Sequence, residues 1–198
     1  RTGQLRSRFC RRPRVVRGGI RMNTEIKQWM YRIVSRLLQY PDSEWRESLE
    51  SIKVSLPKPI IRFIDTVQAA DPVEWEALYV KTFDFGKKTN LYVTYGEYGE
   101  ERERGPVLLE LKSAYENAGF HMNEGELSDY LPVMLEFASI AYDQGSELLA
   151  RRRKAINKIC DELEKADNPY ASLFQLILSI IPELKPKQSA AMEQGETV

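Results

Sequence analysis

The chain of 198 residues contains 29 basic and 29 acidic side chains, but the two signs of charge are unevenly distributed. Residues 1–21 hold eight arginines and no acid, so residues 22–198 hold 21 basic and 29 acidic side chains, a net charge of −8. This acidic body repels phosphate, which argues against nucleic acid as the main partner. Two cysteines are too few for a disulfide framework, and a body of this length can bury a core without one.

The two ends of the chain differ in composition from the part between them. Residues 1–21 resemble an organellar transit peptide in composition but lack the apolar core of a secretory signal, and we interpret them as a non-native or disordered leader. A helical domain is expected over residues 22–184, followed by a disordered polar tail over 185–198. The longest apolar run, near 173–181, is shorter than the roughly 20 residues of a membrane span.

The first part of the body contains four segments with helical signals. Apolar residues in the segment 26–38 recur at i, i+3, i+4 and i+7, and Asn23 or Thr24 can cap this helix. Two more apolar segments at the same period follow, separated from each other by prolines. Asp71-Pro72 then combines a preferred cap residue with proline at the first helical position, which predicts the start of a fourth helix.

A stretch without helical period follows this fourth helix, which we expect to end at Gly86. The residues Leu91–Tyr95 have the composition of a short strand, but one strand has nothing visible to pair with. The sequence therefore predicts a long ordered loop near residues 87–104.

Four further helices are expected after this loop. Pro106 opens the first, and the second begins near Ser128, with Pro132 tolerated because it falls in the first turn. Gly145-Ser146 is expected to separate the second from a long third helix, and a strongly apolar fourth helix ends the body. The sum is an all-α protein, a single-domain helical bundle of about eight helices.

Residue types that support catalysis or metal binding are sparse. His121 is the only histidine and Cys160 stands alone on a helix, so no metal-ligand set occurs at helical spacing. Phosphate-binding glycine motifs and nucleophile motifs are absent as well. We therefore expect no metal, no cofactor and no enzymatic activity. An acid pair, Asp129 and Glu136, would lie about 10 Å apart on one helix, which is wide for concerted catalysis.

Two clusters of aromatic and acidic residues remain as candidate binding sites. Tyr79, Phe83 and Asp84 could pack into the core with a solvated acid, or could line a groove. The second cluster consists of Glu126, Asp129, Tyr130, Pro132 and Glu136. If the two clusters meet, their groove suits a peptide that carries both apolar and cationic residues.

A set of short motifs occurs in order between Tyr79 and Phe137. They are Tyr79-x-x-x-Phe83-Asp84-Phe85, Leu91-Tyr92-x-x-Tyr95, Arg102-x-Arg104-Gly105, Ala118-Gly119-Phe120 and Glu126-Leu127-Ser128-Asp129-Tyr130-Leu131-Pro132-Val133-x-Leu135-Glu136-Phe137. The ordered set resembles the nitrate reductase molybdenum cofactor assembly chaperones (NarJ-type), a branch of the helical redox-enzyme maturation chaperones. Ser128 departs from the proline of the family pattern. Asp129-Tyr130 stands where the wider family often has Asp-His, which favours the nitrate reductase branch.

The resemblance implies a cytoplasmic chaperone for one client, the apo form of the catalytic (alpha) subunit of respiratory nitrate reductase, including its N-terminal leader remnant. Such a chaperone promotes molybdenum cofactor insertion and delays membrane docking until maturation is complete. We expect no nucleic acid partner and no stable membrane insertion. The alternative is a helical adaptor or scaffold with a permanent protein partner, for which a stable complex in mature membranes would be the discriminating finding.

The resemblance and the two clusters together predict where a client peptide binds. Aromatic side chains would make the apolar contacts, and carboxylates would face the client's cations. The predicted contact residues are Tyr79, Phe83, Asp84, Tyr92, Tyr95, Asp129, Tyr130, Pro132 and Glu136. Arg102 and Arg104 could hold the loop against the body or contact a second client surface.

Overall fold

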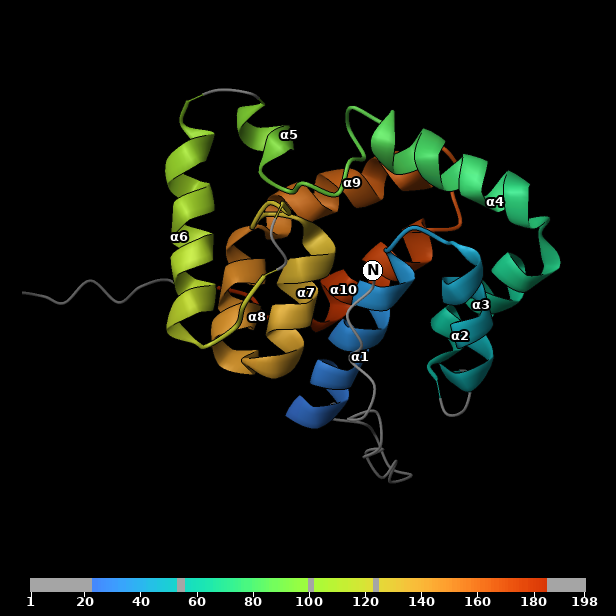
Figure 1. Ribbon diagram of the computed structural model, residues 1–198, viewed down its shortest axis with the longest axis horizontal. Coiled ribbons are helices and arrows are strands. Elements are labelled where there is room, and N and C mark those ends of the chain that lie inside the picture. The colour runs from blue at the N-terminus through green and yellow to red at the C-terminus, as the bar shows by residue number, and fades with distance from the viewer. Residues whose placement is uncertain (1–22, 53–55, 100–101, 123–124, 185–198) are drawn as a thin grey trace, which may run out of the picture.

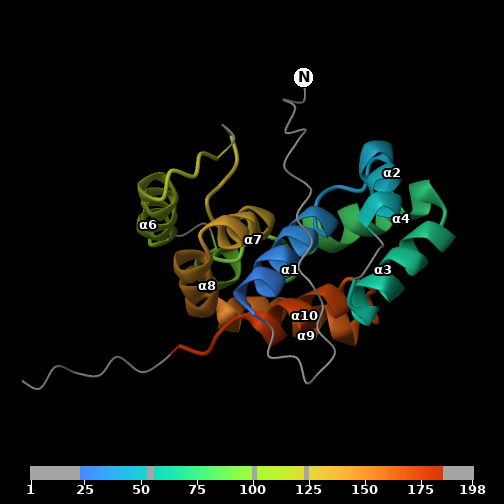
Figure 2. The ribbon, with the colours of Figure 1, turned by 90° about the horizontal axis from the view of Figure 1, so that it is seen from below.

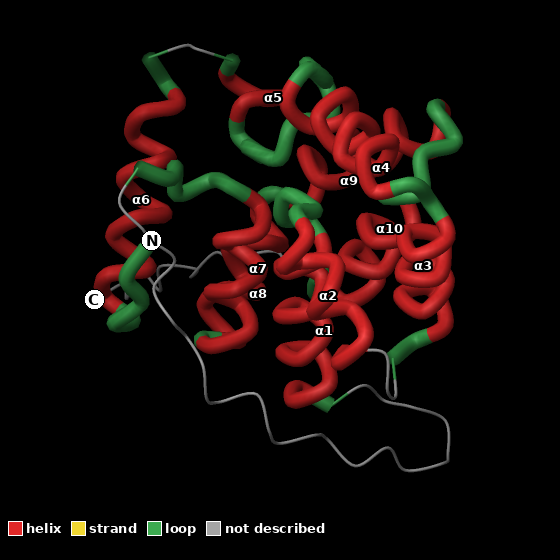
Figure 3. The backbone as a smooth tube through the Cα atoms, turned by 45° about the vertical axis from the view of Figure 1, so that its right-hand side comes forward, coloured by secondary structure: helices red, strands yellow, loops and turns green. Residues whose placement is uncertain are grey.

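The computed structural model describes residues 23–52, 56–99, 102–122 and 125–184. The expected leader over 1–21 and the expected tail over 185–198 lie outside these residues. Within the described ranges the secondary structure consists of helices joined by loops, without a strand (Figure 3). The predicted all-α fold is therefore confirmed.

Ten α-helices and one π-helical segment are described. In chain order they are α1 (Thr24–Leu37), α2 (Ser43–Ile52), α3 (Lys58–Ala69), α4 (Pro72–Tyr79), the π-helical segment η1 (Val80–Asp84), α5 (Tyr95–Tyr98), α6 (Arg104–Asn117), α7 (Leu131–Ile140), α8 (Tyr142–Arg151), α9 (Arg153–Lys165) and α10 (Ala171–Ile180). The number exceeds the predicted eight for two reasons. The short α5 lies inside the predicted loop, and the predicted long helix near the end divides into α8 and α9.

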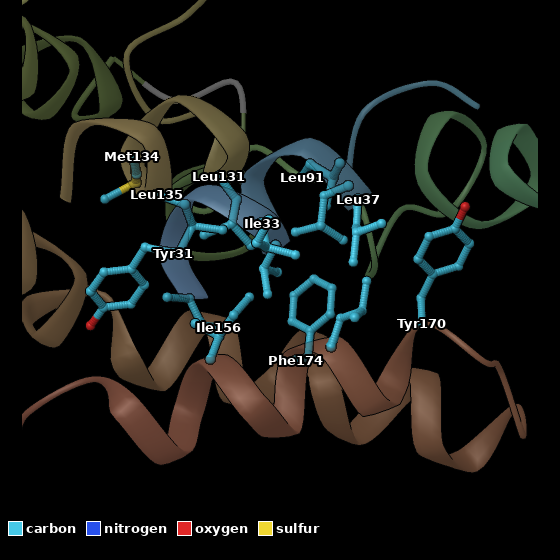
Figure 4. Close-up of a cluster of buried hydrophobic side chains, with 14 of the residues drawn as sticks. Tyr31, Ile33, Leu37, Leu91, Leu131, Met134, Leu135, Ile156, Tyr170 and Phe174 are labelled. Atoms are coloured by element: carbon cyan, nitrogen blue, oxygen red, sulfur yellow. The ribbon is translucent and has the colours of Figure 1, made fainter. Parts of the chain in front are cut away.

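The centre of the molecule is α1, which packs against α7 and α10, while α7 packs on α8 and α9 on α10. Figures 1 and 2 place α6 at one edge and α2, α3 and α4 at the other, with α1 between them. In Figure 4 the side chains of Ile33, Leu131, Ile156 and Phe174, from four different helices, meet in one interior. Burial of this shared apolar face is the main force that holds the helices together.

Local capping signals locate two helix starts. The Asn23 side chain accepts a hydrogen bond from the Ile26 amide at 2.9 Å, as predicted for the start of α1. Asp71 accepts from the amides of Val73 and Glu74 at 2.9 and 3.1 Å, which starts α4. Each cap satisfies first-turn amides that have no partner within the helix.

The glycine predicted to separate two helices lies inside one of them, so this prediction was wrong. Gly145 is part of α8 and is buried, and the chain breaks earlier, at Ala141 between α7 and α8. A Cβ atom at Gly145 would lie 2.3 Å from Cα of Ala138 and 2.7 Å from its nitrogen. Glycine is needed here because α7 and α8 approach each other closely.

Gly145→Ala is therefore expected to destabilise the protein by about 1–3 kcal/mol, the usual range for an overpacked core. Gly96→Ala is the matched control, because Gly96 lies in α5 and a Cβ atom there meets no heavy atom within 4 Å. The control should stabilise the protein slightly, by about 0.4–1 kcal/mol. Urea denaturation of both variants measures the difference, and equal stabilities would contradict this interpretation of Gly145.

The segment without helical period has a partner that the sequence did not reveal. The amide of Val93 donates to the carbonyl of Asp129 at 3.1 Å, and the amide of Leu131 donates to the carbonyl of Leu91 at 2.8 Å. These bonds form an isolated antiparallel bridge between Tyr92 and Tyr130. The bridge places the family motif that contains Tyr92 beside the family motif that contains Tyr130.

Candidate functional site

A buried ion pair lies beneath the bridge. Asp129 is completely buried, and its two carboxylate oxygens accept hydrogen bonds from Nη2 of Arg104 at 3.2 and 3.0 Å. The Arg104 residue is only 9% exposed, although it stands at the first position of α6. A buried charge is tolerated only when it is paired and hydrogen-bonded. Asp129 and Arg104 provide this pairing for each other.

Thr94 completes this buried network and was not predicted. Its amide donates to Oδ2 of Asp129 at 3.2 Å, and its hydroxyl also donates to that oxygen. Nε of Arg104 in turn donates to the Thr94 hydroxyl oxygen at 3.1 Å. Three segments that are distant in sequence are thereby fastened at one point: the bridge segment, the start of α6 and the residue before Tyr130.

The rings of Tyr92 and Tyr95, two residues of one family motif, lie beside the guanidinium group of Arg104. The Arg104 guanidinium carbon lies 5.6 Å from the ring centroid of Tyr95 and 6.0 Å from that of Tyr92. Both distances are in the range of a cation–π interaction. Arg104 thus holds the segment 92–95 against the body, which was one of the two roles expected for it.

Above the ion pair, Tyr92 and Tyr130 are half-buried, with ring centroids 5.3 Å apart. The Tyr92 hydroxyl donates to Oε1 of Glu126 at 3.1 Å. Burial, followed by the effect of the Glu126 carboxylate, raises the pKa of Tyr92 to about 12. The Tyr92 phenol therefore stays protonated at physiological pH. The Glu126 carboxylate that it contacts lies beside the rings of Tyr92 and Tyr130.

The first predicted cluster is divided between the interior and the surface. Tyr79 and Phe83 are buried, and their rings pack against Tyr170 with centroid distances of 6.1 and 4.9 Å. The Tyr79 hydroxyl donates to the carbonyl of Leu38 at 2.9 Å, which ties α4 to the end of α1. Asp84, the last residue of η1, is exposed.

Tyr130 of the second cluster lies close enough to Tyr79 and Asp84 of the first for both to influence its pKa. Burial raises the pKa of Tyr130, a hydrogen bond with Tyr79 lowers it, and the carboxylates of Glu126 and Asp84 raise it further. The pKa of Tyr40 is raised chiefly by the hydrogen bond that its hydroxyl donates to Glu76. The carboxylate of Asp84 raises this pKa further. Asp84 therefore acts electrostatically on Tyr130 of the second cluster and on Tyr40, which belongs to neither cluster.

We call this region the acidic–aromatic surface and define it by Tyr40, Asp84, Tyr92, Glu126 and Tyr130. Tyr40 is 44% exposed, and its ring lies edge-on to buried Tyr79 with a centroid distance of 5.6 Å. The neighbouring Phe85, at 79% exposed, adds apolar area beside Asp84. Exposed aromatic rings among carboxylates suit a ligand that is both apolar and cationic.

Four of the predicted contact residues are buried and support this surface from below. Tyr79, Phe83, Asp129 and Pro132 lie inside the molecule. The Pro132 carbonyl accepts a hydrogen bond from the Ser35 hydroxyl at 2.7 Å, which docks the start of α7 on α1.

The remaining predicted residues lie at the surface or close to it. Tyr95 and Glu136 are half-buried, and Arg102 is exposed. Tyr40 was missed because it lies outside both clusters and outside the motifs that were identified in the sequence.

The acid pair considered for catalysis is not arranged as expected. Helix α7 begins at Leu131, so Asp129 lies outside it and in the bridge, while Glu136 lies within it. Asp129 is completely buried and both of its oxygens are hydrogen-bonded to Arg104, so this carboxylate does not face the solvent from which a substrate would approach. Groups of three or more potential metal ligands do not occur in the part of the chain that the structure describes.

Glu136 lies on α7 in the field of Arg32. Burial raises the pKa of its carboxyl group, and the Arg32 charge opposes this rise in part. A carboxyl group whose pKa is higher in the folded state makes the protein less stable as pH rises from the unfolded towards the folded pKa. Above the unfolded pKa, burial of the Glu136 carboxyl group is therefore a cost to folding.

We expect Glu136→Gln to raise the melting temperature at pH 7, because the amide removes a charge that burial disfavours. The gain should vanish below about pH 4, where the carboxyl group is protonated in both states. Calorimetry across pH measures the effect, with Glu183→Gln as a control on an exposed glutamate. An equal or lower melting temperature at pH 7 would contradict the expectation.

The helices of the described residues include none that is both long and apolar enough to cross a bilayer. Fold and site together define an all-helical protein, within the described residues, with a surface of aromatic and acidic side chains. Comparisons with known proteins give this class a family.

The family model of the nitrate reductase delta subunit matches residues 39–175. The protein assigned in Bacillus subtilis (strain 168) as nitrate reductase molybdenum cofactor assembly chaperone NarJ is 39% identical over 177 residues, which are 85% of this chain and 96% of that one. The NarJ chaperone of Escherichia coli (strain K12) is 34% identical over 159 residues, 75% of this chain and 67% of that one.

Among solved structures, one assigned as a redox enzyme maturation protein from Archaeoglobus fulgidus superposes with a TM-score of 0.61. It is 20% identical and covers 85% of this chain and 98% of its own, which shows a shared fold. The chain therefore belongs to the nitrate reductase delta subunit family. The predicted resemblance to NarJ-type assembly chaperones, which are not catalysts, is confirmed.

Proposed function

We propose that the protein is a chaperone of respiratory nitrate reductase that binds the apo catalytic subunit, including its N-terminal leader remnant. It promotes insertion of the molybdenum cofactor and delays membrane docking until maturation is complete. The names of its relatives support the chaperone role. The acidic–aromatic surface supports the mode of client binding.

The observation that carries the proposal is the position of Asp84 and Glu126 beside exposed or half-exposed aromatic rings. The acids of this surface are not matched by basic partners in the ion pairs of the described residues. A leader remnant with apolar and basic residues would bury its apolar side chains against Tyr40, Phe85 and Tyr130. Its cations would be selected by the carboxylates, which also speed the encounter.

The buried ion pair supports binding without contacting the client. Arg104 and Asp129 fix the segment that carries Tyr92 and the residue before Tyr130. The surface is thus formed before the client arrives, which reduces the entropy lost on binding. In this proposal Arg104 and Asp129 are positioning residues rather than contact residues.

The proposal is tested in a strain that lacks its own nitrate reductase assembly chaperone but makes the catalytic subunit. Expression of this chain should restore molybdenum content of the purified catalytic subunit and nitrate reductase activity. It should also co-purify with the apo subunit but not with the mature membrane enzyme. A stable stoichiometric complex with the mature enzyme would instead identify a permanent adaptor, and unchanged molybdenum content would contradict the chaperone role.

A further inference from the structure

A cavity lies next to the bridge segment, between this segment and α9. Residues 87–96 and the outer face of α9 enclose a cavity of about 510 Å³. Figure 1 shows the segment between η1 and α5 running alongside α9. Apolar residues with little exposure, Val93, Ala155 and Ile159, contribute to its lining, together with the ring of Tyr95.

The rim of this cavity is basic although the body as a whole is acidic. Four lysines line it, Lys87 and Lys88 from the loop and Lys158 and Lys165 from α9. Two carboxylates, Asp161 and Glu162, leave an excess of two positive charges. The net charge of −8 over residues 22–198 makes this concentration of lysines a local exception.

One carboxylate serves two of these lysines. Glu162 contacts Lys88 at 3.4 Å across the cavity and Lys165 at 2.7 Å along α9. Within the described residues, no recorded ion pair engages Lys87 or Lys158. At the end towards α5, Arg152 and Glu97 form an ion pair at 3.0 Å that joins α5 to the start of α9.

The arrangement of the lysines favours a peptide over a single phosphate group. Lys158 and Lys165 are seven residues apart on α9, which is about 10 Å along the helix, and the loop lysines lie on the opposite rim. A phosphate site has donors that converge on one point. An extended peptide instead directs alternate side chains to opposite faces, with about 7 Å between neighbours on one face.

We propose that this cavity binds an acidic peptide segment whose apolar side chains rest on the floor while its carboxylates reach the lysine rims. The inference rests on the proposed function, because it supplies a second contact for the same kind of partner, a polypeptide client. The two surfaces share Tyr92, whose hydroxyl donates to Glu126 and which is also one of the residues that line the cavity. They select opposite charges, so one client can engage both without competition.

The test uses the full chain and a fluorescein-labelled octapeptide that alternates Glu with Leu, followed by fluorescence anisotropy. Lys87→Glu with Lys158→Glu should weaken its binding by about tenfold or more, because two attractive charges become repulsive. Lys58→Glu with Lys112→Glu makes the same charge change on exposed lysines of α3 and α6, and should leave affinity within about twofold. Lys158→Ala alone should weaken binding in the same direction if the double variant fails to fold.

Equal affinity for the wild-type chain and the Lys87→Glu, Lys158→Glu variant would overturn the proposal. It would also be overturned if inorganic pyrophosphate, but not the octapeptide, bound in a manner that depends on these lysines. An octapeptide alternating Lys with Leu, measured in parallel, reports on the acidic–aromatic surface and should be unaffected by the lysine variants. If the octapeptide of Lys and Leu fails to bind while the octapeptide of Glu and Leu binds, the result counts against the proposed function. The proposal for the basic cavity would still hold.

Discussion

Replacing Asp129 with alanine should destabilise the protein by about 3–5 kcal/mol, because Arg104 would remain buried without its counter-charge. The Thr94 amide and hydroxyl would lose their acceptor at the same time. Chemical denaturation followed by circular dichroism measures the effect. A cost below about 1 kcal/mol, the value of an exposed pair, would show that the ion pair does not hold the bridge in place.

A double variant separates the contribution of the ion pair from the cost of leaving one charge buried without its partner. Arg104→Met with Asp129→Leu removes both charges and fills similar volume, so stability should return most of the way to that of the wild type. The double variant should still bind a cationic leader peptide less well, because the rings of Tyr92 and Tyr95 lose the guanidinium that fixes them. Wild-type affinity in the double variant would contradict the positioning role.

Neutralising the acidic–aromatic surface should weaken leader binding by about tenfold. Asp84→Asn with Glu126→Gln removes two carboxylates but keeps side-chain size and, at Glu126, an acceptor for Tyr92. Partly exposed ion pairs contribute up to about 1 kcal/mol each, and 1.4 kcal/mol corresponds to tenfold in affinity. The residual binding should also depend less on salt than that of the wild type.

Isothermal titration calorimetry with a synthetic leader peptide from the client, at two salt concentrations, measures this effect. Asp143→Asn with Glu183→Gln makes the same change of charge on exposed acids outside the surface and should leave the affinity within about twofold. A matched loss of affinity in this control would mean that overall charge, not the defined surface, governs binding.

Much of the helical framework is predictable because its signals are local. Caps at Asn23 and Asp71 were located correctly, since each depends only on the next three residues. The role of Gly145 was not predictable in this way. A glycine that separates helices and one that lets two helices approach have the same sequence appearance, and only the contact with Ala138 distinguishes them.

The candidate site was predictable in its composition but not in its orientation. The bridge brings Tyr92 and Tyr130 together, yet sequence alone does not tell whether an acid faces solvent or a buried arginine. Arg104 and Asp129 are 25 residues apart, and the bridge that unites them involves no regular strand. The basic cavity was missed for the same reason, because its lysines come from segments about seventy residues apart along the chain.

In the proposed function, the acidic–aromatic surface contacts the leader remnant of the apo catalytic subunit. Site-specific photocrosslinking tests it directly, with p-benzoylphenylalanine in place of Phe85, which is 79% exposed beside Asp84. Mass spectrometry should find the crosslinked peptide within the N-terminal leader of the client, whereas the probe at Leu109, 66% exposed on α6, should give no leader adduct. Leader adducts from Leu109 but not from Phe85 would contradict the account.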